Sequence, residues 1–119
     1  MTLHLLNRET SAPIIGPVDA AVLLSGTPET RVFVTYDAPA ERLCAGEWEA
    51  TVGKWRVSYD EWEYCLMVSG RCIVTGDDGR IITAGPGDSF VIEPGFSGTW
   101  EVLEPMRKHW VIRTPAEPA

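Results

Sequence analysis

Residues 63–98, EYCLMVSGRCIVTGDDGRIITAGPGDSFVIEPGFSG, decide the fold. They contain four apolar runs rich in β-branched and aromatic residues, at 64–68, 72–75, 81–83 and 90–92. Each run is followed by a segment of Gly, Asp or Pro, and these residue types favour turns because Gly accepts positive φ and Pro fixes φ. The pattern predicts a meander of short antiparallel strands joined by tight turns.

Further strand patterns flank this stretch on both sides. Their residues are β-branched or aromatic, or alternate between apolar and polar as in half-buried strands. The predicted strands are 31–36, 42–51, 55–59, 99–103 and 108–113. We expect Glu104-Pro105 to separate the last two, because proline cannot donate a hydrogen bond to a strand ladder. Roughly ten short strands at this spacing predict an all-β domain, a sandwich or a small barrel.

The first 30 residues are the least regular part of the chain, because Pro and Gly interrupt every apolar segment. Leu3, Leu5 and Leu6 are compatible with a short strand, and residues 19–24 with either a helical turn or an edge strand.

The expected organisation is one domain in three parts. Residues 1–40 supply N-terminal strands and a connecting segment that packs on the barrel or on a partner. Residues 41–113 form the barrel, and residues 114–119 form a frayed tail. A chain of 119 residues suits a single domain of this kind.

The composition excludes several classes of function. The formal net charge is −7, which disfavours binding to nucleic-acid phosphates. No apolar run approaches the ~18 residues that a membrane-spanning helix needs, and the N-terminus lacks the basic start and apolar run of a signal peptide. We therefore expect a cytoplasmic protein with no nucleic-acid or membrane partner.

The three cysteines, Cys44, Cys65 and Cys72, form no Cys-x-x-Cys motif and cannot all pair. A nucleophilic cysteine needs a base such as histidine. His4 and His109 are the only histidines, and nothing in the sequence brings either one close to a cysteine. We therefore expect reduced, buried cysteines that pack as small hydrophobic residues.

Two motifs carry a family resemblance. Glu63 precedes Gly70 by seven positions, and Gly87-Asp88 precedes a strand and a turn at Pro94-Gly95, as in the paired motifs of the cupin superfamily. More narrowly, residues 46–113, with GPGDxFVI and GFxGTWEV, resemble the small single-domain cupins grouped with the (S)-ureidoglycine aminohydrolase cupin domain (DUF861, Cupin_3), which are related to the ethanolamine-utilisation cupin. The resemblance implies an all-β cupin (RmlC-like) jelly-roll β-barrel, usually dimeric, with a pocket inside the barrel.

The resemblance also implies a metal held by histidines and a glutamate, and here the sequence departs from it. The His-x-His of the first motif falls at Val57 and Tyr59, or within one residue of them, and the histidine of the second motif falls at Gly98. Only Glu63 remains of the ligand set. A transition metal needs three or four converging ligands, so we expect no metal cofactor, although Tyr59, Asp60 or Cys65 could improvise a site.

Strand alternation indicates what fills the pocket instead. If Glu63 points inward, so do side chains two and four positions along its strand, and aromatic residues of neighbouring strands share that face. The resemblance suggests that Lys108 also points inward. We expect Glu63 and Lys108 to face each other in place of a metal, either as catalytic residues or as a purely structural ion pair. The predicted ligand-binding residues are Tyr59, Trp55, Trp100, Cys65 and Met67.

These expectations favour a homodimeric cupin that binds a small molecule around Glu63 and Lys108, in a degenerate metal site with aromatic walls. The alternative is a metal-dependent enzyme of the aminohydrolase type, acting on a ureido or amino compound. The sequence leaves open whether any reaction is catalysed.

Overall fold

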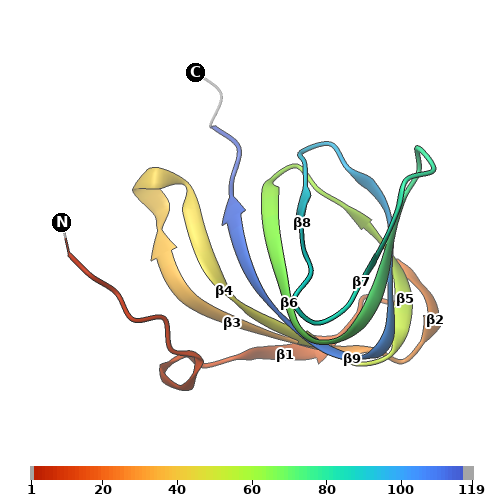
Figure 1. Cartoon of the computed structure of the whole chain (residues 1–119), viewed down its shortest axis with the longest axis horizontal. Helices are drawn as coiled ribbons and strands as arrows, with labels where there is room; N and C mark the ends of the chain where they lie inside the picture. Colours follow the sequence, from red (N-terminus) through yellow and green to blue (C-terminus); the bar gives the residue numbers. More distant parts are fainter. Residues whose placement is uncertain (1, 117–119) are drawn as a thin grey trace.

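The computed structural model describes residues 2–116, and these residues form one antiparallel sheet of nine strands (Figure 1). The strands are β1 (Ile14–Pro17), β2 (Leu23–Gly26), β3 (Glu29–Ala38), β4 (Leu43–Ala50), β5 (Gly53–Ser58), β6 (Trp62–Gly76), β7 (Ile81–Ala84), β8 (Ser89–Ile92) and β9 (Ser97–Arg113). Two short 3-10 helices, η1 (Arg8–Thr10) and η2 (Pro39–Glu41), complete the described elements. Within residues 2–116, no helix is long and apolar enough to cross a membrane.

The strand β9 lies at the centre of the fold. One edge of β9 pairs first with β5, from Ser97 to Val102, and then with β4, from Met106 to Arg113. The other edge pairs with β6, which in turn pairs with β7 and β8. This pairing curls the sheet around a common interior, as Figure 1 shows for β5 to β9, and it confirms the predicted all-β class.

The prediction of separate short strands on either side of Gly70, and of Glu104-Pro105, is wrong. Each pair of runs forms one continuous strand, β6 or β9. Opposite Gly70, whose φ is +82°, lie two residues of β9, Pro105 and Met106, and the register shifts on both sides. Such a β-bulge bends the two strands without ending their pairing. The tight turn predicted between the runs 72–75 and 81–83 is confirmed, since β6 and β7 pair on either side of it.

The structure resolves the conformation of residues 3–6 and 19–24, which the sequence left open. Leu3, Leu5 and Leu6 lie in no strand and are exposed. Residues 19–24 contain a turn closed by a hydrogen bond from the Val22 amide to the Asp19 carbonyl, followed by the edge strand β2. Strands β1, β2 and β3 all join the chain's own sheet. Of the tail predicted at 114–119, residues 117–119 lie outside the described range.

Arg8 fastens this N-terminal segment to the outer face of the sheet. Its guanidinium lies 2.7 Å from Glu49 Oε1 and 3.5 Å from Glu47 Oε1, and it stacks over the Phe33 ring at 4.1 Å from the centroid. Arg107 Nε lies 3.3 Å from the same oxygen, Glu47 Oε1. Glu47 is therefore buried although it lies on the face opposite the barrel interior.

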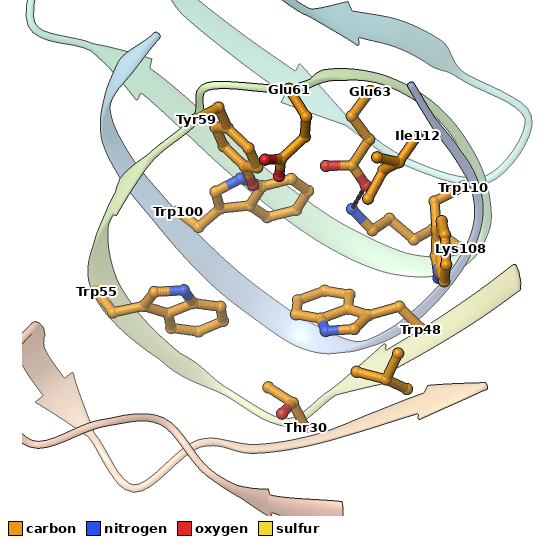
Figure 2. A pocket seen from close by; sticks show the side chains of 11 residues that line it. Thr30, Trp48, Trp55, Tyr59, Glu61, Glu63, Trp100, Lys108, Trp110 and Ile112 are labelled. Carbon is orange, nitrogen blue, oxygen red and sulfur yellow. Dashed lines mark hydrogen bonds and ion pairs between the residues drawn. The ribbon is translucent and has the colours of Figure 1, made fainter. Parts of the chain in front are cut away.

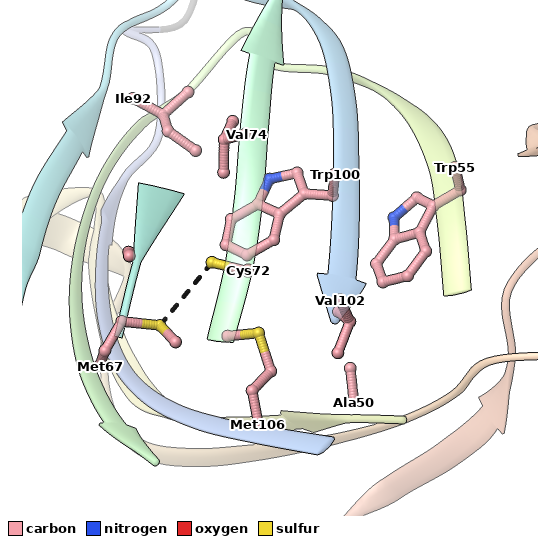
Figure 3. Close-up of a cluster of buried hydrophobic side chains, with 10 residues drawn as sticks. Ala50, Trp55, Met67, Cys72, Val74, Ile92, Trp100, Val102 and Met106 are labelled. Carbon is pink, nitrogen blue, oxygen red and sulfur yellow. Dashed lines mark hydrogen bonds between the residues drawn. The ribbon is translucent and has the colours of Figure 1, made fainter. Parts of the chain in front are cut away.

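The hydrophobic core fills one end of the interior (Figure 3). It is built from inward-facing side chains of the long strands, in which every second residue shares a face. Its buried members are Ala50, Trp55, Met67, Cys72, Val74, Ala84, Ile92, Trp100, Val102 and Met106. Because β6 and β9 each contribute on both sides of the bulge, one bent pair of strands forms most of this core.

The bulge generates a stability prediction. A β-carbon at Gly70 would overlap the Pro105 carbonyl oxygen and the Met106 backbone, and φ is positive there. We expect Gly70→Ala to lower the free energy of unfolding by roughly 2–4 kcal/mol, combining backbone strain with overpacking.

Gly79→Ala is the matched control, because Gly79 has a φ of +91° and open space around it. Its expected loss is only the backbone cost of about 1 kcal/mol. Urea unfolding of both variants measures the difference, and equal losses would show that the close approach at Gly70 is unimportant.

Candidate functional site

A cavity of about 340 Å³ opens inside the curled sheet, beside the hydrophobic core (Figure 2). Five of its eleven lining residues are aromatic, and three carry a carboxylate or an ammonium group: Glu61, Glu63 and Lys108. The full lining is Thr30, Val32, Trp48, Trp55, Tyr59, Glu61, Glu63, Trp100, Lys108, Trp110 and Ile112. A volume of this size, with apolar walls and few polar groups, is typical of small-molecule sites.

The register of β9 with its neighbours positions the basic residue. Lys108 pairs with Trp48 of β4 on one side and with Met67 of β6 on the other, while Glu63 lies further along β6, opposite Ile112. Residues directly opposite in antiparallel strands share a face of the sheet. The Lys108 side chain must therefore extend along the inner face to reach Glu63, as Figure 2 shows.

Glu63 and Lys108 form a buried ion pair. The Lys108 Nζ lies 2.8 Å from Glu63 Oε2, and the two side chains are only 6% and 5% exposed. The same ammonium donates to Cys65 Sγ at 3.3 Å and lies 4.5 Å and 4.9 Å from the ring centroids of Trp100 and Trp48. A buried charge is costly unless it is paired, and here a carboxylate and two aromatic faces compensate it.

The pKa values follow from this arrangement. Burial acts to lower the pKa of the Lys108 ammonium, but the facing carboxylate of Glu63 outweighs it, so the pKa is raised. Burial raises the pKa of the Cys65 thiol to about 12 against the opposing charge of Lys108. Cys65 is therefore a neutral thiol at physiological pH, which leaves Glu63 as the partner that keeps Lys108 charged.

One polar group in the wall has no regular hydrogen bond. The indole Nε1 of Trp100 is buried and makes no hydrogen bond to any residue of the described chain. Figure 2 shows this nitrogen on the side of the ring that faces Tyr59 and Glu61. An unsatisfied buried donor costs about 1–3 kcal/mol, so a bound acceptor at this point would be favourable.

The structure brings five of the seven predicted site residues to the cavity. Glu63, Lys108, Tyr59, Trp55 and Trp100 line it. The other two predicted residues, Cys65 and Met67, do not. Cys65 lies beneath the Lys108 ammonium, and Met67 packs in the hydrophobic core, because their part of β6 runs from the cavity towards the bulge.

Sequence reasoning missed several lining residues, of which Trp48 and Glu61 matter most. Trp48 had a usable signal, because it alternates with Glu47 and Glu49 and must therefore face inward. Glu61 lies in the loop before β6, where no periodicity indicates direction.

Residues 38–110 match the family model described as the EutQ-like cupin domain, which is more than half of the chain. The chain belongs to this cupin family. No curated protein sequence matches it. With the curled antiparallel sheet, the match confirms the predicted cupin jelly-roll barrel.

Solved structures show the same fold. A DUF861-family protein of unknown function from Pseudomonas syringae superposes with a TM-score of 0.76 at 21% identity, over 86% of this cupin and 43% of that chain. The EutQ protein of Clostridium difficile gives 0.65 at 18% identity, over 72% and 63% of the two chains. This cupin thus spans less than two thirds of either protein. A DUF861-family protein from Thermotoga maritima gives 0.52 at 36% identity, over 54% and 73%.

The residues of this cupin do not fit the metal that the superfamily resemblance implies. Within residues 2–116, no three His, Cys, Asp or Glu side chains converge on one point. The position beside Glu63 is taken by the Lys108 ammonium. At Gly98, where a histidine ligand would fall, a β-carbon would overlap the Thr75 carbonyl oxygen, so the backbone leaves no room for a side chain.

The ion pair generates the second prediction. Removing one partner leaves an uncompensated buried charge, so Glu63→Gln and Lys108→Met should each lower the free energy of unfolding by about 3–5 kcal/mol. The double variant should lose clearly less than the sum, because neither charge is then left alone.

Urea unfolding measures these losses. Asp77→Asn is the control, since Asp77 forms an equally short pair with Arg56 at 2.8 Å but on the exposed surface, and its loss should be much smaller. Strictly additive losses in the double variant would show that the two charges do not depend on each other.

Proposed function

We propose that this cupin binds a small, partly polar molecule in the aromatic cavity around Glu63 and Lys108. The observation that carries the proposal is the cavity of about 340 Å³ that adjoins both a buried ion pair and an unpartnered donor, Trp100 Nε1. An ion pair with a purely structural role has no need of an adjoining cavity. Cavities of this size that combine apolar walls with a few convergent polar groups are the usual form of ligand sites.

The polar groups leave bonding capacity for a ligand. An ammonium has three N–H donors, and the hydrogen bonds to Glu63 and Cys65 use two of those of Lys108. Tyr59 adds a hydroxyl at the cavity wall, whose pKa burial raises while the charge of Lys108 opposes the rise. Tyr59 is therefore a neutral hydroxyl that can both donate and accept a hydrogen bond.

The alternative is membership in the (S)-ureidoglycine aminohydrolase subfamily, with chemistry on a ureido or amino group. The donor set argues against its metal-dependent form, because the ammonium of Lys108 stands where a cation would lie. What remains is acid–base chemistry by Glu63 and Lys108, for which a pKa near the working pH is needed. The raised pKa of Lys108 moves away from that range, so the binding function is better supported.

The third prediction tests binding. Small molecules released by denaturing the purified protein should include one organic compound at about one per chain, which then raises the Tm when added back. Trp55→Ala and Tyr59→Phe should reduce both effects. Trp62→Ala should not, because Trp62 lies outside the cavity lining and is partly exposed.

Metal analysis of the same preparation separates the two functions. We expect Mn, Fe, Ni and Zn at far less than one ion per chain and no change in Tm on treatment with a chelator. A stoichiometric metal lost together with activity would favour the enzyme and contradict the binding proposal.

The proposal includes a homodimer formed through the β1 edge. This strand ends the sheet order, and its Ile14 and Ile15 are 69% and 50% exposed, close in sequence to the exposed leucines of the N-terminal segment. An open, apolar edge strand is a natural pairing site for another chain.

The fourth prediction is that light scattering gives about twice the chain mass of 13.1 kDa. Ile14→Arg should shift the protein to the monomer. Ile81→Arg should not, although Ile81 of β7 is similarly exposed. A wild-type monomer at micromolar concentration would contradict the dimer.

A further inference from the structure

The charges that line the cavity do not balance. Lys108 and Glu63 neutralise each other at 2.8 Å. Glu61, the third wall residue with a carboxylate or ammonium group, forms no ion pair with any residue of the 2–116 range. Figure 2 shows the Glu61 carboxylate directed into the cavity, on the side of Tyr59 and Trp100. The cavity therefore carries one negative charge in excess.

The surroundings of Glu61 make this charge unfavourable when the cavity is empty. Burial raises the pKa of the Glu61 carboxyl, and the neighbouring carboxyls of Asp60 and Glu63 raise it further. A positive charge bound beside Glu61 would relieve both effects, whereas an anion would add to the repulsion.

The aromatic walls favour a cation as well. In this same cavity, the Lys108 ammonium already lies over two tryptophan rings at 4.5 Å and 4.9 Å from their centroids. Tyr59, which lies beside Glu61 in Figure 2, has no such cation over its face among the described contacts. A second ammonium placed there would face a carboxylate and an aromatic ring, and both of these groups attract organic ammonium ions.

Trp100 supplies an independent observation. Its Nε1 is a buried donor that lies near the Tyr59 hydroxyl but forms no regular hydrogen bond to it or to any other described residue, and Trp100 is only 2% exposed. A ligand that satisfies it must present an acceptor, and an ammonium group cannot do so. The ligand needs a hydroxyl or carbonyl oxygen in addition to its charge.

We infer that the ligand of this cavity is a small organic cation, a primary or quaternary ammonium that also carries a hydroxyl or carbonyl oxygen. The inference rests on the proposed binding function. The ammonium lies against Tyr59 beside Glu61, and the oxygen accepts the hydrogen bond from Trp100 Nε1. Glu61 and Trp100 thus determine specificity for the ligand, while the Glu63–Lys108 pair forms the adjoining part of the cavity wall.

Choline and its uncharged carbon isostere, neohexyl alcohol, test the charge. The two probes have nearly the same shape and the same hydroxyl, so only the charge differs. Titration calorimetry at neutral pH and low salt should show choline binding about tenfold more tightly, the usual size of a partly desolvated cation–π and carboxylate contribution. Glu61→Gln should remove most of that advantage without changing the affinity for neohexyl alcohol. The control Glu104→Gln, on the exposed part of β9, should change neither.

Tetramethylammonium tests the oxygen. It keeps the charge of choline and lacks the hydroxyl, so Trp100→Phe should weaken choline several-fold and leave tetramethylammonium unaffected. A merely structural role of Trp100 would weaken both probes equally.

The possible results separate the inference from the function on which it rests. Equal or tighter binding of neohexyl alcohol, or an undiminished preference for choline in Glu61→Gln, would overturn the cation assignment and leave the binding function standing. The same holds if neither probe binds while an anionic or neutral compound raises the Tm and loses that effect in Trp55→Ala. If no compound of any charge binds, both the inference and the proposed function are overturned.

Discussion

The ion pair between Glu63 and Lys108 constrains the whole interior of this cupin. Two charged side chains, each about 95% buried, are held at 2.8 Å among tryptophan rings. Such a pair gains little net stability over an apolar replacement, because the loss of hydration offsets most of the attraction. Once it is present, however, neither partner can move or be replaced alone. It therefore fixes the relative position of β6 and β9 at the base of the cavity.

The backbone is consistent with a barrel that holds no imidazole cluster. Gly98 packs so closely on β6 that no side chain fits, and Tyr59 lines the wall where the resemblance would place a histidine. The ammonium of Lys108 occupies the position next to the one retained acid. In the site that we propose, a covalently attached cation takes the electrostatic place of a metal ion, without the open coordination positions that metal catalysis requires.

The bulge shared by β6 and β9 explains how the fold brings the residues of the cavity together. It allows two long strands to bend around the interior while their pairing continues, so that one strand contributes to both the core and the cavity wall. Met67 and Lys108 illustrate the result, since they pair directly across the strands yet one packs in the core and the other lines the cavity. Fold membership alone does not specify a ligand, which depends on the few polar groups that this bend brings together.

The sequence by itself predicted the all-β class and which side chains share a face with Glu63, because side-chain alternation along a strand is a local property. Only the tertiary structure decided that the runs on either side of Gly70 are one strand. The same glycine suits a turn or a bulge, and the choice depends on which residues of β9 lie opposite.

The sequence also could not predict how deeply each side chain is buried or which distant residues it contacts. Cys65 and Met67 share the inward face of Glu63, yet they lie outside the cavity lining, because the curvature of the sheet determines how far each position is from the opening. The orientation of Glu61 in its loop, and the burial of Glu47 beneath Arg8, depend on contacts between residues far apart in the chain. Periodicity specifies which residues share a face of the sheet, and only the assembled sheet specifies what those residues contact.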